Sequence, residues 1–393
     1  MPIINSMLDN DFYKFSMMQA IFHRFPDVNV EYEFKLRNYE GVSFVHLIDE
    51  VDKEVRHLCT LRFNAHELDY LRKFSWLSEN FIEYLRMFQL NDSYIKVWYD
   101  ESRGYYGNFR VSIKGSWLNT ILFEVPVLAI ISELFSKDRM ANSKQSFQGD
   151  ERLDTKLKFL AGRVNSLKIA DFGTRRRFSN DWQGKVIAKM LKSGYLIWTS
   201  NVHFARMFDT KPIGTQAHEW FMAMQALTRV SDSQKFALEN WAQEYRGKLG
   251  IALTDTIGID AFLRDFDLYF AKLFDGCRQD SGDPVEWTNK LITHYEGLGI
   301  DPKTKTAVYS DGLTFPDALD LYQRFHERIK VSFGIGTNLT NDVGIIAPQI
   351  VIKMTRCQGR PVAKVSDSPG KSMCPDEDYI NHVRKVFGLG AVK

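Results

Sequence analysis

The sequence lacks the short cysteine and glycine signatures that identify several common protein classes. Its four cysteines (Cys59, Cys277, Cys357 and Cys374) form no CxxC pair and have no histidine at zinc-finger spacing. This argues against a zinc module or a disulfide-stabilised secreted domain. There is no GxxxxGK[ST] loop, and no GxGxxG follows an apolar segment, so neither common nucleotide-binding loop is indicated. We expect a reduced, cytoplasmic chain.

The chain also lacks an excess of charge of either sign. Its 393 residues include 51 Lys and Arg against 49 Asp and Glu, a net charge of +2. Domains that bind nucleic acids or membrane surfaces carry a clustered basic excess. We therefore predict no nucleic-acid or membrane partner, and we expect any anionic ligand to be held by a local site.

Long hydrophobic runs are scarce as well. The N-terminal segment carries Asp9 and Asp11 where the apolar part of a signal peptide would begin. The most apolar stretch, residues 120–135, contains two glutamates and a proline and is shorter than the roughly 20 residues that span a bilayer. We expect no membrane span.

What the chain does contain is two different hydrophobic periodicities. Up to about residue 125, apolar and polar residues alternate over 28–36, 109–113 and 121–125, which predicts strands with one wet face. Helical, aromatic-rich stretches lie near 44–58, 65–74 and 79–88. This pattern is typical of an α+β domain with an antiparallel sheet.

From about residue 165 onward, short apolar segments alternate with amphipathic helices. The eight predicted strands are LKIADFG, YLIWTSN, KPIGTQAHE, LGIALTD, LFDGCRQDSG, TAVYSDG, KVSFGIG and QIVIKM. Their number and apolar character favour a parallel α/β barrel, although an open doubly wound sheet is an alternative. We predict an N-terminal α+β domain (1–140), an α/β barrel domain (141–355) and a C-terminal segment (356–393) that packs back on the N-terminal domain.

Polar clusters follow the predicted barrel strands. Because ligands bind at the carboxyl ends of parallel strands, these clusters are expected to converge on one mouth. The candidates among them are Phe172, Arg175, Asn201, His218, Glu219, Asp255, Arg278, Asp280, Asp311, Gly312, Gly334, Gly336 and Thr337.

Each cluster suggests a chemistry. Gly334 and Gly336 would let backbone N–H groups approach a phosphate, with a tight turn as the alternative. Arg175 could pair with a carboxylate or phosphate, and Phe172 could stack on an aromatic ligand or belong to the core.

The remaining candidates are ionisable. Asp255, Asp280 and Asp311 together suit a positively charged sugar-like centre, or a Mg²⁺ ion carried in by a polyphosphate. His218, at a junction of strand and helix beside Glu219, is either structural, a general base or a nucleophile that carries a group covalently.

Taken together, these motifs resemble a known family. DFGTRRRFS, GTQAHEWFMA, LTDT, CRQDSGDP, YSDGL and SFGIGTNLTND, with DFYKFSMMQA near the N-terminus, are similar to motifs of the nicotinate phosphoribosyltransferases of bacterial NAD salvage. The resemblance extends from about residue 8 to the KVSDSPGKSM segment. It implies the irregular α/β barrel of type II phosphoribosyltransferases.

The resemblance also implies a reaction. The family joins nicotinate to 5-phosphoribosyl 1-pyrophosphate (PRPP), releases pyrophosphate, and couples this to ATP hydrolysis through a phosphohistidine, with Mg²⁺ held by the substrate rather than by fixed protein ligands.

The family's site residues carry over by position. Its phosphohistidine would be His218, with Asp255 and Asp280 facing the ribose. Phe172 and a Tyr13 from a neighbouring subunit would enclose the pyridine, which implies a homodimer. The carboxylate would meet Arg175, with Arg278 nearby. The ribose hydroxyls and 5-phosphate would meet Asp311, Gly312, Gly334, Gly336 and Thr337.

Three alternatives stay open at this point. The first is a phosphoribosyltransferase for nicotinamide or quinolinate, and the second is a barrel glycosidase that uses two of the aspartates. The third is a non-catalytic barrel that binds a phosphorylated metabolite.

Overall fold

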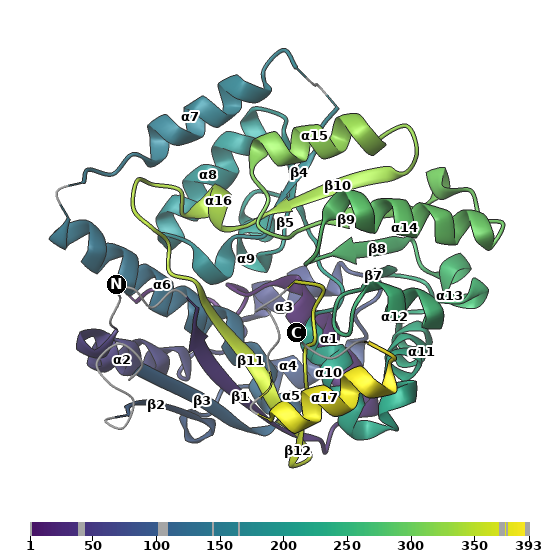
Figure 1. The fold of residues 1–393 in the computed structure, drawn as a ribbon. Coiled ribbons are helices and arrows are strands. Elements are labelled where there is room, and N and C mark those ends of the chain that lie inside the picture. Colours follow the sequence, from purple (N-terminus) through teal and green to yellow (C-terminus); the bar gives the residue numbers. More distant parts are fainter. Residues whose placement is uncertain are drawn as a thin grey trace.

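Two sheets organise the chain, one antiparallel and one parallel (Figure 1). The structure is a computed structural model that defines residues 2–37, 44–100, 109–143, 145–163, 166–368, 374 and 376–389. The two sheets confirm the predicted combination of an irregular α/β barrel with an N-terminal α+β region.

The antiparallel sheet joins strands from both ends of the chain. In the central strand, every second residue from Val30 to Leu36 is buried, which confirms the strands predicted at 28–36 and 109–113. The members are β1 (Asn29–Leu36), β2 (Ile95–Tyr99), β3 (Phe109–Ser116), β11 (Ile350–Cys357) and β12 (Arg360–Pro361). Their order is β12-β11-β1-β3-β2.

Helices make up the rest of the N-terminal region, as the aromatic-rich stretches predicted. They are α1 (Phe12–Arg24), η1 (Val45–Leu47), α2 (Ile48–Leu58), α3 (Ala65–Arg72), α4 (Glu79–Met87), η2 (Asp92–Tyr94), α5 (Trp117–Thr120), η4 (Ile121–Phe123) and α6 (Glu124–Asn142). The strand predicted at 121–125 is wrong, because this stretch is helical. Residues 121–131 are all buried, and an apolar run buried on every side does not distinguish helix from strand by periodicity.

The helical run Trp117–Asn142 is apolar enough to be compared with a membrane span. Its mean hydropathy is 1.7, but 89% of its most apolar window is buried inside the protein. Most of this run therefore lies in the interior of the protein.

The parallel sheet forms an incomplete barrel. Its strands are β4 (Ile169–Asp171), β5 (Leu196–Thr199), β6 (Lys211–Pro212), β7 (Ile251–Leu253), β8 (Gly276–Gln279), β9 (Thr306–Tyr309) and β10 (Lys330–Ile335). The order β6-β5-β4-β10-β9-β8-β7 is the cyclic order of a barrel that is open between β6 and β7. Side chains bridge this opening, since Ser16 Oγ donates to the carbonyl of Thr215 (2.8 Å) and Thr215 Oγ1 to that of Ile251 (2.7 Å).

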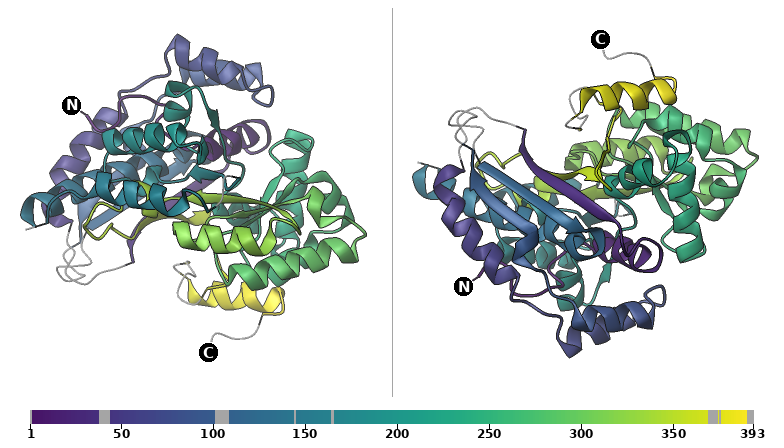
Figure 2. Two further views of the ribbon diagram at one scale, coloured as in Figure 1. Left: turned by 90° about the horizontal axis from the view of Figure 1, so that it is seen from above. Right: turned by 90° about the horizontal axis from the view of Figure 1, so that it is seen from below.

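Helices surround the parallel strands, as Figure 2 shows from two sides. They are α7 (Gly149–Leu160), η5 (Thr174–Arg176), α8 (Asn180–Lys192), α9 (Val202–Met207), α10 (His218–Leu227), η6 (Val230–Asp232), α11 (Ser233–Tyr245), α12 (Ile259–Asp265), α13 (Leu268–Leu273), α14 (Pro284–Gly297), η7 (Pro302–Thr304), α15 (Phe315–Phe325), α16 (Thr337–Thr340) and α17 (Glu377–Val386).

The eighth predicted barrel strand, QIVIKM, is wrong as a barrel strand. It forms β11, which pairs antiparallel with β1 from Val30–Cys357 to Leu36–Ile350. Most of its residues are buried, because α6 and α10 both contact it. A strand covered by helices has the same apolar sequence whichever sheet it joins.

The C-terminal helix packs on the barrel side of the molecule. In α17, Val383 lies in one apolar cluster with Ile257 and Ala261 of the α12 region and with Val365. The domain boundaries at 140/141 and 355/356 stay predictions. The last part of the KVSDSPGKSM motif, residues 369–373, lies outside the described residues.

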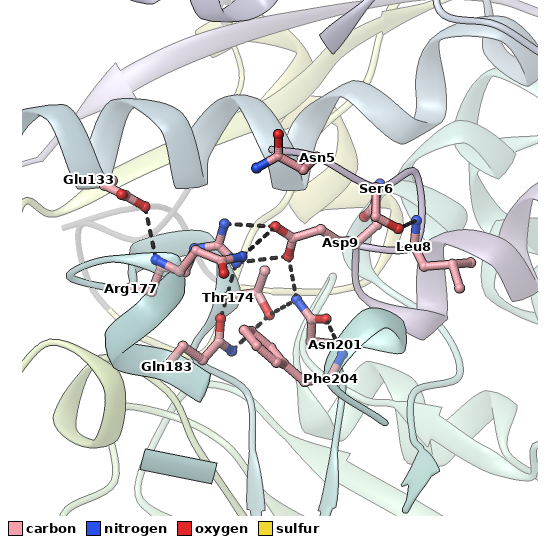
Figure 3. Close-up of polar contacts among 12 residues, drawn as sticks. Asn5, Ser6, Leu8, Asp9, Glu133, Thr174, Arg177, Gln183, Asn201 and Phe204 are labelled. Carbon is pink, nitrogen blue, oxygen red and sulfur yellow. Dashed lines mark hydrogen bonds and ion pairs between the residues drawn. The ribbon is translucent and has the colours of Figure 1, made fainter. Parts of the chain in front are cut away.

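A buried ion pair attaches the N-terminal segment to the barrel (Figure 3). Arg177 and Asp9 are both fully buried or nearly so, and their two contacts measure 2.7 and 2.8 Å. Asn201 donates to the same carboxylate (2.7 Å). Burial alone would raise the pKa of Asp9, but Arg177 and Asn201 hold it below its usual value. The pair therefore stays ionised, with bidentate geometry.

We predict that Arg177→Met destabilises the protein by about 3–5 kcal/mol, because it leaves the Asp9 carboxylate buried without its cation. Urea denaturation measures this as a lower midpoint at an unchanged slope. Replacement of the exposed Arg163 by Met is the control and should change stability by less than about 0.5 kcal/mol. Equal losses in the two variants would contradict the role of the pair.

Candidate active site

A cavity of about 340 Å³ lies at the carboxyl ends of the parallel strands. Loops after β4, β6, β8, β9 and β10 line one side of it, and α1, α6 and β11 line the other. The predicted site residues that line it are Tyr13, Phe172, Arg175, His218, Glu219, Arg278, Asp280, Asp311, Gly312, Gly336 and Thr337. The polar clusters thus converge on one mouth, as the strand pattern predicted.

His218 is held at the first position of α10. It is buried, and its Nε2 lies 2.9 Å from Asp255 Oδ1 and 3.7 Å from Asp280 Oδ2. Burial and the nearby Lys364 lower the pKa of His218 to about 4, despite the attraction of Asp255. The ring is therefore neutral near pH 7. Since Nε2 is bonded to Asp255, Nδ1 is the nitrogen available as a nucleophile.

Asp255 lies behind the histidine rather than in the cavity lining. Its Oδ2 accepts from Ser281 Oγ (2.6 Å) and from Lys364 Nζ (2.7 Å). Burial would raise the pKa of Asp255, yet His218 and Lys364 lower it well below its usual value. Lys364 thus supplies the positive charge that the buried carboxylate requires, and His218 need not be protonated.

Asp280 lines the cavity beside this cluster. Its Oδ1 accepts from Ser310 Oγ (2.8 Å), and ligand atoms of His218, Asp255 and Asp280 lie within 4.8 Å of one another. These donors could hold a divalent cation. Lys364 and Ser281 already engage Asp255, however, so the second oxygen of Asp280 is the best placed of these carboxylate oxygens.

Phe172 and Tyr13 are the phenylalanine and tyrosine of the cavity lining. A Cβ at Gly334 would lie 2.2 Å from the Phe172 ring, so glycine allows the ring to lie against β10. Gly334 was predicted to contact phosphate. The structure places it behind Phe172 instead, and it is not among the lining residues.

Tyr13 belongs to the cavity of its own chain. The sequence led us to expect it from a neighbouring subunit, but it lines this cavity because the start of α1 is fixed on the barrel. Phe12 N donates to the carbonyl of Ser200 (2.7 Å). Gly214, with φ +149°, lets the chain pass where a Cβ would lie 2.8 Å from Tyr13 N. This removes the reason for requiring a second subunit, and the homodimer stays a prediction.

Asn201 has a structural place in this fold. It is the N-cap of α9, where its Oδ1 accepts from Phe204 N (3.0 Å) while its amide binds Asp9 (Figure 3). It does not belong to the cavity lining. The sequence therefore located this polar cluster at a strand end correctly. Its Asn201 helps to attach the N-terminal segment to the barrel.

Several cations of the cavity were missed from the sequence. Arg37, Arg176, Lys353 and Lys364 all line it. Burial and the neighbouring Arg175 and Arg37 lower the pKa of Arg176 to about 9, and burial lowers that of Lys353 to about 7. Cations whose charged forms are disfavoured by burial and by neighbouring cations are typical of a site that binds a polyanion. A single lysine within an apolar strand was the signal that could have identified Lys353.

Two arginines of the barrel, Arg175 and Arg278, are also available to bind an anion. Arg175 Nη1 lies 3.5 Å from Glu124 Oε1 and is about one-third exposed, so much of its hydrogen-bonding capacity is open to a ligand. Arg278 Nε is buried and has no hydrogen-bond partner among the described residues. A buried donor of this kind is expected to meet a ligand.

Comparison with known proteins agrees with this geometry. The nicotinate phosphoribosyltransferase (NAPRTase) N-terminal domain matches residues 8–132, and the nicotinate phosphoribosyltransferase (NAPRTase) family matches residues 167–391. A nicotinate phosphoribosyltransferase from Cupriavidus necator is 52% identical over 391 residues, which cover 98% of this chain and 99% of the relative.

Solved structures share the whole fold. The crystal structure of nicotinate phosphoribosyltransferase from Vibrio cholerae has a TM-score of 0.94 at 43% identity and covers 99% of this chain and 95% of that one. That from Porphyromonas gingivalis has a TM-score of 0.91 at 32% identity, with coverages of 98% and 100%. Sequence and structure together show that the chain belongs to the nicotinate phosphoribosyltransferase family, enzymes of pyridine nucleotide biosynthesis.

Proposed function

We propose that the enzyme forms nicotinate mononucleotide and pyrophosphate from nicotinate and PRPP, and couples this transfer to ATP hydrolysis through a phosphohistidine at His218. Family membership gives the nicotinate phosphoribosyltransferase activity, and the ATP-coupled step goes beyond it. The observation that carries the proposal is the 2.9 Å contact between His218 Nε2 and Asp255, which leaves Nδ1 available at the cavity.

The phosphoryl step follows from this arrangement. Nδ1 of the neutral His218 attacks the γ-phosphorus of ATP, so that an N–P bond forms while the P–O bond to ADP breaks. The Nε2 proton remains on the hydrogen bond to Asp255, which stabilises the positive charge that develops on the ring. His218 begins α10, and the unpaired N–H groups of a helix start favour phosphoryl oxygens. Water later cleaves the N–P bond and releases phosphate.

We assign the pyridine ring to a position between Phe172 and Tyr13, which both line the cavity. Aromatic faces stack on a flat heterocycle, and Arg175 offers its guanidinium to the carboxylate. Nicotinate carries that negative charge and nicotinamide does not. The arginine therefore favours nicotinate over nicotinamide as the acceptor.

PRPP is assigned to the loops after β9 and β10. Asp311 and Gly312 would face the ribose, and the backbone at Gly336 and Thr337 the 5-phosphate. Asn338 ties the two loops together, since its Nδ2 donates to the carbonyls of Gly312 and Leu313 (both 2.9 Å).

The leaving group and the reacting carbon complete the assignment. Arg37, Arg176 and Lys353 would neutralise the pyrophosphate, with Mg²⁺ arriving on the substrate. Displacement at the anomeric carbon develops positive charge, so the fixed carboxylate of Asp280 would stabilise it. The predictions that the protein is cytoplasmic and binds neither nucleic acid nor membranes remain part of this proposal.

We predict that His218→Asn abolishes stable labelling by ATP. Wild-type enzyme incubated with γ-labelled ATP and Mg²⁺ should carry an acid-labile phosphate in near-stoichiometric amount, because phosphohistidine hydrolyses in acid. His326→Asn changes an exposed histidine that bonds its own helix and should label normally. Full labelling of His218→Asn would refute the assignment.

We predict that Arg175→Met raises the KM for nicotinate about 10- to 100-fold, the effect expected for a lost hydrogen bond to a charged group. Turnover of nicotinamide and quinolinate should be measured beside it by pyrophosphate release. An unchanged KM for nicotinate would assign the carboxylate to another residue.

We predict that Tyr13→Ala and His218→Asn do not complement each other when mixed. Each chain builds Tyr13 into its own cavity, so a mixed oligomer contains no site with both native residues. The measurement is nicotinate mononucleotide formation at low nicotinate after co-refolding the two variants. Recovery of up to a quarter of wild-type activity would mean that Tyr13 acts across a subunit interface.

A further inference from the structure

Lys14 is a fully buried lysine whose ammonium group joins two carboxylates. Its Nζ lies 2.6 Å from Glu124 Oε2 and 2.8 Å from Glu219 Oε1. Both glutamates line the active-site cavity, and Lys14 is absent from its lining. The ammonium therefore acts from behind the cavity wall.

The two carboxylates lead to different parts of the site. Glu124, at the start of α6, contacts Arg175 through its other oxygen at 3.5 Å. Glu219 follows His218 directly at the start of α10. Lys14 itself, in α1, follows Tyr13 of the cavity lining. One ammonium thus connects α6, whose Glu124 contacts Arg175, with α10, which begins at His218.

The charges of these groups oppose any rearrangement of the link that Lys14 forms between Glu124 and Glu219. Lys14 and Arg175 carry two positive charges against the two carboxylates of Glu124 and Glu219, and all of these groups except Arg175 are buried. Removal of one member of a buried ion cluster leaves an uncompensated charge. Here it would leave two carboxylates that repel each other across the position of the ammonium. Glu124 would then be left to Arg175 and to Lys353, which also acts on it from β11.

We propose that Lys14 is a positioning residue that sets the guanidinium of Arg175 and the His218 end of α10 in one mutual geometry. This inference rests on the proposed function, in which Arg175 meets the substrate carboxylate and His218 carries the phosphoryl group. Loss of Lys14 draws Glu124 toward Arg175, which competes with nicotinate. It also frees Glu219, so the start of α10 is no longer held against α1.

The test compares Lys14→Met and Lys14→Arg with Lys305→Met. Lys305 is a matched control because it is also buried and donates to the carbonyls of Lys272 and Phe274 (3.2 and 2.7 Å). It precedes β9, at the end of the strands away from the cavity. Three quantities are measured for each folded variant: the KM for nicotinate, the ATP hydrolysed per nicotinate mononucleotide formed, and the melting temperature.

Lys14→Met should raise the KM for nicotinate roughly tenfold and should hydrolyse more ATP per product than wild type. Lys14→Arg, which keeps the charge, should lie between the two. Lys305→Met should lower the melting temperature, while the KM for nicotinate and the ATP hydrolysed per nicotinate mononucleotide stay at their wild-type values. The inference is overturned if Lys14→Met changes only the melting temperature, or if Lys305→Met shifts KM and ATP use equally.

Glu219→Gln carries the same test if Lys14→Met does not fold. It keeps the shape of the side chain, removes one ion pair, and should shift KM and ATP use in the same direction. Wild-type controls separate the two proposals. If wild type forms no phosphohistidine, the proposed function fails. If wild type is labelled and both variants keep wild-type KM and ATP use, the positioning role alone fails.

Discussion

The active site depends on one buried salt bridge, between Asp9 and Arg177. It fixes the segment that precedes α1 against the loop after β4, and this loop also carries Phe172 and Arg175. Because the pair is bidentate and almost completely excluded from water, it defines an orientation as well as a distance. Tyr13 and Lys14 follow within five residues of Asp9, so their positions at the cavity derive from the same attachment. Residues near both sheets line the substrate pocket. The pocket therefore keeps its shape only if the two sheets are held rigidly against each other.

Charge in the molecule is distributed unevenly around that joint. The chain as a whole is close to neutral, whereas the cavity brings together cations from β11, from the loop after β4 and from the segment after β12. Burial, together with repulsion by Arg175 and Arg37, lowers the pKa of Arg176 to about 9. Lys14 forms ion pairs with Glu124 and Glu219, and Lys364 forms one with Asp255. The site therefore presents positive charge to a ligand while its buried anions are internally compensated.

The sequence predicted the parts of this site that follow local rules. Polar residues after apolar strands identified His218, Asp280 and Asp311, because the ends of parallel strands meet at one edge. It failed where the outcome depended on long-range packing. The assignment of QIVIKM (residues 349–354) to the barrel failed because burial by helices gives the same apolar pattern in either sheet. Gly334 was linked to phosphate because a sequence does not reveal which ring a missing Cβ accommodates. Lys353 was missed because its place at the barrel mouth depends on the antiparallel pairing of β11 with β1, and Lys364 because it reaches Asp255 from the segment after β12.

The pairing of β11 with β1 has a consequence for the stage of synthesis at which the active site is completed. The ribosome must release both the first strand and nearly the last one before this sheet can form, and Lys364 lies further still along the chain. A nascent polypeptide that has emerged only through β10 holds His218 and Asp255 but lacks Lys364 and the wall formed by β11. His218 therefore acquires the positive charge of Lys364 near it only at the end of synthesis.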